Sequence, residues 1–413
     1  MRNDPYVSLK NPDFRRFVSA RLLLTIATEM QGVIVGWQIL QYTKDPLLFG
    51  LVALTEAIPF ILTALFAGHV ADIIERKKII TVATIILSVF TFLLFTFTLN
   101  NSYILHRYGI LPIYFVIFFT GIGRAFIAPS FFAFLSQIIP REDYPNATTW
   151  NSTAWQTGAI AGPALGGVLC VIGLNIGYIT DFSLMIIALA LFSFIKSRPL
   201  PEKQKKEDLF TSLSTGIKFV FSNQVVIGAL SLDLFAVLFG GAVTLLPLFA
   251  STVLHTGSIG FSLLRAAPSV GAVLMATIMV HRPPFKNAGR NMLLAVLGFG
   301  ICMILFAIST NLVLSIFLLA LSGAFDSVSV IIRATILQLM TPDEMRGRVS
   351  SVNNIFLGSS NEIGGFESGL VAKLMGLIPS VIFGGSMTIL VVGFTSLKAK
   401  TLRTLHLDTK KEV

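Results

Sequence analysis

The sequence predicts an all-α polytopic membrane protein whose twelve transmembrane helices form two six-helix bundles. Three observations predict this fold class: a membrane-type composition, a series of long apolar segments, and a repeat that relates the two halves of the chain. Of the 413 residues, 54% are hydrophobic and 13% are charged, whereas about 25% of the residues of a soluble domain are charged. A composition this apolar leaves no room for a large soluble domain.

The apolar segments are each about 20 residues or longer, which is the length of a helix that crosses a bilayer. They follow one another along almost the whole chain. The predicted spans cover residues 14–42, 47–73, 78–99, 109–137, 150–173, 174–195, 222–252, 257–281, 289–309, 311–338, 347–374 and 379–399.

The positive charges behind the net charge of +10 are distributed unevenly among the loops, and this distribution predicts the orientation of the chain in the membrane. Lys and Arg gather in alternate loops and in both terminal segments, while only Lys44, Arg107 and Lys373 fall in the loops of the opposite side. This is the positive-inside asymmetry, which places both termini in the cytoplasm. The basic character is therefore explained without a nucleic-acid partner, and the lipid bilayer is the expected surrounding.

A repeat divides the chain at its only long polar connection, SRPLPEKQKKEDL. An offset of 202 residues aligns Gly121 with Gly323 and Pro140 with Pro342, together with four further positions around the fourth and fifth spans. The predicted domains are an N-terminal bundle at 1–195, a cytoplasmic linker at 196–221, and a C-terminal bundle at 222–413 that ends in a short cytoplasmic tail. Such repetition is typical of secondary transporters.

The fifth span contains GAIAGPALGGVL, in which small residues recur every four positions. Glycines at this spacing lie on one helix face and let a neighbouring backbone approach closely, and the proline adds a bend. Ordinary close packing without a mechanistic role is the alternative. The segment resembles the antiporter motif of the major facilitator superfamily, and the matching residues are Gly158, Gly162, Pro163, Gly166 and Gly167. The resemblance implies an exporter.

The loop GHVADIIERKK resembles a second motif of that superfamily, although Ile73 and Glu75 depart from it. The resemblance implies a cytoplasmic gate, in which basic residues pair with acids of the adjacent loop. The alternative is a simple positive-inside anchor. The gate residues expected here are Gly68, Asp72, Arg76, Lys77, Glu142 and Asp143. The segments FRRFVSARLLL and LSQIIPREDYPNATTWNS are similar to the branch that includes the bacterial enterobactin exporter and macrolide-efflux carriers.

Ionisable residues inside the spans are the candidates for a transport mechanism, because a charge at the bilayer centre costs at least about 2.5 kcal/mol. They are Glu29, Arg124, Asp233, Asp326 and Arg333. We expect Glu29 to pair with Arg124, and Asp233 or Asp326 to exchange a proton. Arg333 is expected to bind an anionic substrate or to pair with Asp326. Static ion pairs that hold helices together are the alternative.

Two further acidic residues lie within the predicted spans. Asp181 is expected near the end of a span, and Glu56 has no obvious partner. Trp37, Gln38 and Trp155 are the candidates for lining a substrate cavity.

These observations together favour a proton-coupled exporter of amphipathic small molecules, drug-like or siderophore-like, that works by alternating access. An uptake symporter or lipid flippase of the same fold is the first alternative, and a polytopic membrane enzyme is the second. The chain has no phosphate loop, clustered Asp residues or metal-binding pattern, so neither ATP hydrolysis nor a cofactor or metal is expected. The expected partners are the substrate and protons, or sodium, and the expected form is a monomer in a bacterial inner membrane.

Overall fold

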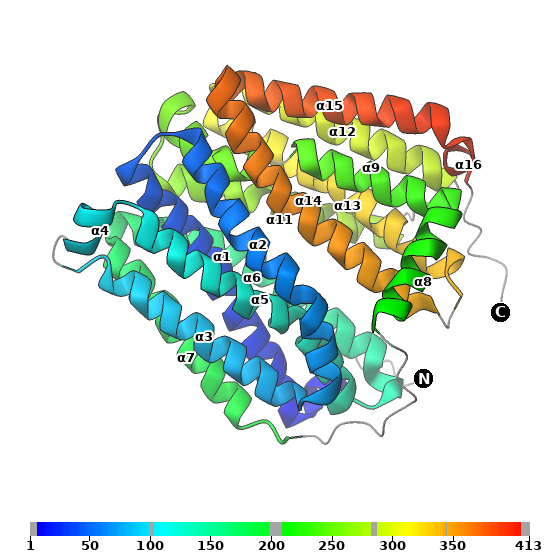
Figure 1. Cartoon of the computed structure of the whole chain (residues 1–413), viewed down its shortest axis with the longest axis horizontal. Coiled ribbons are helices and arrows are strands. Elements are labelled where there is room, and N and C mark those ends of the chain that lie inside the picture. The colour runs from blue at the N-terminus through cyan, green and yellow to red at the C-terminus, as the bar shows by residue number, and fades with distance from the viewer. Residues whose placement is uncertain are drawn as a thin grey trace. The chain divides into compact units, whose positions relative to one another are not determined.

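A computed structural model describes residues 6–99, 103–197, 209–240, 242–281, 287–342 and 345–405. These residues are almost entirely helical and contain no strand, which confirms the predicted fold class (Figure 1). The first six spans are α1 (Pro12–Tyr42), α2 (Pro46–Ile73), α3 (Arg76–Thr96), α5 (Leu111–Ile138), α6 (Tyr144–Ile172) and α7 (Leu174–Ser193). The later long helices begin with α9 (Gln224–Gly240) and continue with α11 (Ser258–His281), α12 (Ala288–Ile308), α13 (Leu312–Met340), α14 (Arg346–Met375) and α15 (Leu377–Lys398).

Short helices complete the chain. α4 (Tyr103–Tyr108) precedes α5, α8 (Leu209–Ser222) lies within the expected linker, and α16 (Lys400–Arg403) follows α15. Eleven helices of the described residues are long and apolar enough to cross a membrane. α14 is as long as these helices but is not among them, and its first half is rich in Ser and Asn.

The seventh span agrees with the expected segment 222–252, because Gln224–Val253 is one candidate span, but its helical geometry changes along its length. After α9 ends at Gly240, the chain passes through a 3-10 turn (Ala242–Leu245), α10 (Leu246–Leu248) and a π-helical turn (Phe249–Val253). Pro247 has no N–H to donate to a regular helix. Gly240 lies against the Phe299 ring, where a Cβ atom would overlap it. The second part of the span therefore departs from regular α-helical geometry.

Two tight turns separate adjacent spans at glycines. Gly173 joins α6 to α7 with φ 156° and Gly376 joins α14 to α15 with φ 96°. Positive φ values of this size favour glycine because it has no Cβ atom. The first turn lies at the boundary predicted between the spans 150–173 and 174–195.

Contacts divide the chain into two compact units, each with its own core. The first unit contains residues 1–44, 55–203 and 256–266, and the second contains 45–54, 204–255 and 267–413. In the first unit α1 packs on α6 and α7, and α3 on α5 and α7; in the second, α12 packs on α13 and α15 (Figure 1). The first half of α11 therefore belongs with helices of the N-terminal half, and the start of α2 with helices of the C-terminal half.

The core of the first unit is aromatic. Phe17 of α1 lies 5.3 Å from Phe131 and 6.1 Å from Phe134, measured between ring centroids, and both partners belong to α5. Phe192 of α7 closes the cluster. Large apolar side chains are also exposed on the outside, including Phe66 at 66% and Leu390 at 64%. Such exposure is expected where hydrocarbon replaces water as the solvent.

The start of α2 meets the end of α14 within the second unit. A Cβ atom built on Gly369 would lie 2.6 Å from Gly50 Cα, so the two backbones touch without intervening side chains. Beside them, Lys373 Nζ donates to Asp45 Oδ2 at 2.6 Å. This hydrogen bond is the largest cause of a lowered pKa at the Asp45 carboxyl.

Candidate functional site

The intramembrane acids of the first unit are paired differently from the expected pairing of Glu29 with Arg124. Glu29 Oε2 on α1 lies 3.6 Å from Arg265 Nη2 on α11. Arg124 on α5 contacts Glu56 on α2 in an ion pair. These ion pairs could not be predicted from the sequence, because the partner of each charged side chain depends on how its helix is rotated about its axis.

Asp181 corrects a second expectation. It is fully buried on α7 rather than near an exposed helix end. Its Oδ2 accepts a hydrogen bond from Gln31 Nε2 at 3.0 Å, and the same nitrogen donates to Thr91 Oγ1 at 2.7 Å. The side chain of Asp181 thus lies in a polar cluster that joins α1, α3 and α7 inside the membrane.

The second unit contains a buried ion pair between Asp233 of α9 and Arg333 of α13. Their side chains are only 5% and 4% exposed. Arg333 therefore pairs with Asp233 and not with Asp326, which was one of its expected partners. Asp326 is half-buried on α13 and makes no hydrogen bond or ion pair within the described part of the chain. The two acids expected to exchange a proton thus differ within the described residues: Asp233 has a counter-ion there and Asp326 has none.

The glycines of GAIAGPALGGVL form a backbone contact along α1. A Cβ atom would lie 2.6 Å from Thr25 Cβ if built on Gly158, and 2.7 Å from Glu29 Cβ if built on Gly162. Gly166 approaches α1 in the same way, and α6 remains helical through Pro163. α1 and α6 run parallel here, since successive glycines meet successive turns of α1. No larger residue fits this face without moving a helix.

Gly167 extends the motif to a third helix. A Cβ atom on it would overlap the hydroxyl of Ser262 on α11, and its carbonyl accepts a hydrogen bond from Ser258 Oγ at 2.9 Å. Within the first unit, the motif therefore fixes α6 against both α1 and the first turns of α11.

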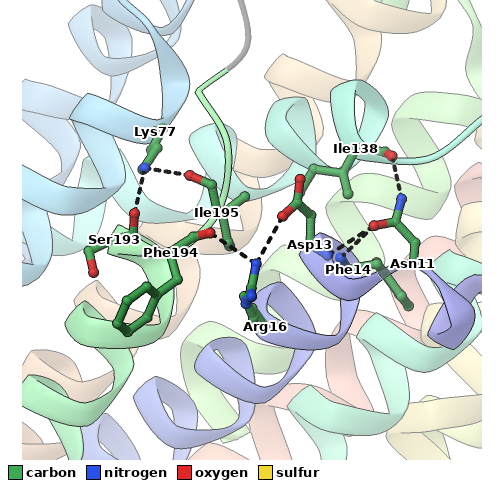
Figure 2. A network of polar contacts seen from close by, with 9 residues as sticks. All are labelled: Asn11, Asp13, Phe14, Arg16, Lys77, Ile138, Ser193, Phe194 and Ile195. Atoms are coloured by element: carbon green, nitrogen blue, oxygen red, sulfur yellow. Dashed lines mark hydrogen bonds and ion pairs between the residues drawn. The ribbon is translucent and has the colours of Figure 1, made fainter.

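The basic loop between α2 and α3 contacts the end of α7. Lys77 Nζ donates to the carbonyls of Ser193 at 3.0 Å and Ile195 at 2.5 Å (Figure 2). Lysine near a helix C-terminus satisfies carbonyls that have no intrahelical partner and interacts favourably with the helix dipole. Arg16 acts similarly, because its Nη1 donates to Phe194 O at 3.0 Å while lying 3.4 Å from Asp13 Oδ1.

The other residues expected at the cytoplasmic gate differ in their burial. Arg76 is half-buried at the start of α3, Glu142 is exposed and Asp143 is half-buried. No ion pair joins Arg76 to either acid among the described residues. Gly68 and the Asp72 side chain lie outside the described part of the structure.

The three expected cavity residues have separate surroundings. Trp37 stacks on Phe261 of α11, with ring centroids 6.4 Å apart. Gln38 is buried and its Oε1 accepts a hydrogen bond from Tyr178 OH at 2.6 Å, so it joins α1 to α7. Trp155 on α6 is 44% exposed.

The partners of Glu56, Arg265 and Asp181 are the main features of the site that the sequence did not indicate. Each is an ionisable residue within an apolar segment, and this signal alone marks it as worth testing. Within the described ranges, no group of three or more His, Cys, Asp or Glu residues is arranged to hold a metal ion.

Comparisons with known proteins agree with this architecture. The model of the transmembrane secretion effector family matches residues 3–411. Enterobactin exporters from Shigella boydii serotype 4 and Shigella dysenteriae serotype 1 are each 26% identical over 392 residues, which is 93% of this chain and 90% of the exporter.

Solved structures resemble the fold at lower identity. A bacterial homologue of the human lysosomal transporter Spinster, solved in an inward-facing and unoccupied conformation, is similar with a TM-score of 0.74 and 14% identity, covering 96% of this chain and 98% of its own. A D-xylose–proton symporter has a TM-score of 0.73 and 13% identity, covering 98% of this chain and 100% of its own.

Proposed function

Because the chain belongs to the transmembrane secretion effector family of the major facilitator superfamily, we propose that it exports amphipathic small molecules in exchange for protons by alternating access. It is a multi-pass membrane transporter and not an enzyme. The enterobactin exporters that it resembles support a siderophore-like or drug-like cargo. A bacterial inner membrane, cytoplasmic termini and a monomeric form belong to the same proposal.

The observation that carries the direction of transport is the glycine face of α6. Gly158, Gly162 and Gly166 match the exporter motif at its fixed positions and are used as backbone contacts on α1. In the proposal, the halves 1–195 and 222–413 reorient about a central substrate site, joined by the linker at 196–221. The close contact holds α6 and α1 together during that motion, which limits leakage.

Proton exchange is assigned to Asp326. A carboxyl with no counter-ion changes its protonation when its access to water changes, whereas a paired carboxylate resists protonation. Asp233 is compensated by Arg333, so its role in the proposal is structural. The gate motif, through Lys77 and its basic neighbours, stabilises cytoplasmic helix ends.

Purified protein in liposomes with a pH-sensitive dye in the lumen tests this proposal. Catecholate siderophores, macrolides and lipophilic cations are added in turn to the wild type and to Asp326→Asn, with Ser183→Ala, an exposed position on α7, as the control. We expect cargo and protons to move in opposite directions, and Asp326→Asn to bind cargo without proton movement. Cargo movement without protons, driven by sodium, or in the same direction as protons would contradict the proposal.

A further inference from the structure

Two carboxyl groups inside the first unit share one arginine. Arg124 pairs with Glu56 and also lies close enough to the Asp181 carboxyl to attract it electrostatically. The remaining acid of this region, Glu29, has its own cation in Arg265. The guanidinium of Arg124 therefore interacts electrostatically with carboxyl groups of both α2 and α7.

The described hydrogen bonds of Asp181 supply a donor to only one of its two carboxyl oxygens. Its Oδ2 accepts from Gln31, but its Oδ1 is buried and has no hydrogen-bond partner among the described residues. An ionised carboxylate in a nonpolar interior needs a counter-ion or donors to both oxygens, and otherwise takes up a proton. Tyr178, the other titratable residue close to Asp181, donates its hydroxyl to Gln38. Among the described residues, no donor contacts Oδ1 to compensate a negative charge there.

The ion pair of Arg124 is more accessible than Asp181. The side chains of Arg124 and Glu56 are 34% and 20% exposed, whereas Asp181 is 0% exposed. The ion pair of Arg124 and Glu56 therefore reaches the surface of the first unit, whereas Asp181 does not. Gln31, held by Thr91, keeps the Asp181 carboxyl oriented within the cluster.

We propose that Asp181 is a proton-binding site whose occupancy depends on which of the two carboxyl groups Arg124 contacts. With the guanidinium on Glu56, as in this structure, Asp181 keeps its O–H bond. When the guanidinium moves to Asp181, that O–H bond breaks, the proton passes to water, and Glu56 remains ionised in contact with water. The site rests on the proposed function, because it names a proton that the exporter exchanges in addition to the one at Asp326.

Infrared spectroscopy of the full-length protein in lipid nanodiscs, without cargo, tests the site directly. All variants carry Asp326→Asn, so that this carboxyl does not contribute to the carbonyl stretch of protonated acids. We expect that band to be lost in Asp181→Asn. We also expect Glu56→Gln to remove it, because Arg124 then pairs with Asp181 and displaces its proton. Glu56 itself is ionised and contributes nothing to the band.

Glu75→Gln is the matched control. Glu75 is also an ion-paired acid, with Lys78 at 3.2 Å, and hydrogen bonds from Ser197 and Lys78 lower its pKa. Removing it should leave the band unchanged, since it lies outside the membrane-spanning segments. A band that persists in Asp181→Asn, or is the same in Glu56→Gln as in Glu75→Gln, overturns the proposal. If Asp181→Asn does not fold, Gln31→Leu is measured in its place. This variant must shift the frequency of the band, because it removes the hydrogen bond to Asp181 Oδ2. An unshifted band likewise overturns the proposal.

The liposome assay separates this site from the proposed function. If the wild type moves cargo without protons, the proposed function fails, and the infrared band still decides whether Asp181 carries a proton. If the wild type exchanges protons for cargo and Asp181→Asn exchanges the same number, the proposed function stands and the Asp181 site is overturned. A reduced proton-to-cargo ratio in Asp181→Asn, without loss of cargo binding, supports the site.

Discussion

The buried pair of Asp233 and Arg333 predicts a large and specific loss of stability in Asp233→Asn. The substitution leaves Arg333 charged in an environment where its side chain is only 4% exposed. Removing one partner of a buried ion pair costs about 3–5 kcal/mol, mostly because the other charge is left uncompensated. Asp326→Asn removes no ion pair described in the structure, so we expect it to cost less than about 1 kcal/mol.

Denaturant titration in detergent micelles, followed by tryptophan fluorescence, measures both values. The double variant Asp233→Leu/Arg333→Leu removes both charges and should recover most of the loss, because replacing a whole buried pair by apolar residues is often close to neutral. A double-mutant cycle then gives the coupling between the two sites. If Asp233→Asn destabilises the protein no more than Asp326→Asn, the assignment of Asp233 as a structural acid is refuted.

Three further outcomes follow from contacts described above. Gly162→Leu should destabilise the protein by about 1–3 kcal/mol, because its side chain would overfill the contact with α1; an unchanged denaturation midpoint would contradict this. Tyr178→Phe should cost about 1–3 kcal/mol by leaving Gln38 unpaired, and adding Gln38→Leu should return part of that loss in the same titration. The lowered pKa of Asp45 means that its pair with Lys373 stabilises the fold above the unfolded pKa of Asp and loses that effect as pH falls through the lower folded value. The protection factors for amide hydrogen exchange at the start of α2, which correct for the pH dependence of the intrinsic exchange rate, should therefore fall on acidification in the wild type, while in Lys373→Met they should be low already at neutral pH.

The fold was predictable from the sequence because hydrophobic length and glycine spacing act along a single helix. The spacing of Gly158, Gly162 and Gly166 leaves one face of α6 without side chains, and α1 packs on that face. The 3-10 and π-helical turns after Gly240 were not predicted. A continuous apolar segment does not indicate where its helical geometry changes.

The partners of the membrane charges were harder to predict for the same reason. Arg124 lies at a suitable depth for several acids, and its contact with Glu56 is decided by the rotation of α2 and α5 about their axes. Asp181 was expected near a helix end, yet its short side chain is buried where Gln31 and Thr91 supply the polar partners. The depth of a residue in the membrane can be estimated from its own segment, but its ion-pair partner depends on how several helices pack.

The contact between Gly50 and Gly369 has a consequence for the energetics of separating α2 from α14. Interlocked side chains must change rotamer before two helices part, and they gain or lose conformational entropy of up to about 2 kcal/mol each when they do so. A surface made of bare backbone has no rotamers to rearrange. Within the second unit these two helices therefore meet through bare backbone, where dispersion and solvation oppose their separation, and the adjacent ion pair of Asp45 and Lys373 adds a directional contact that has to break.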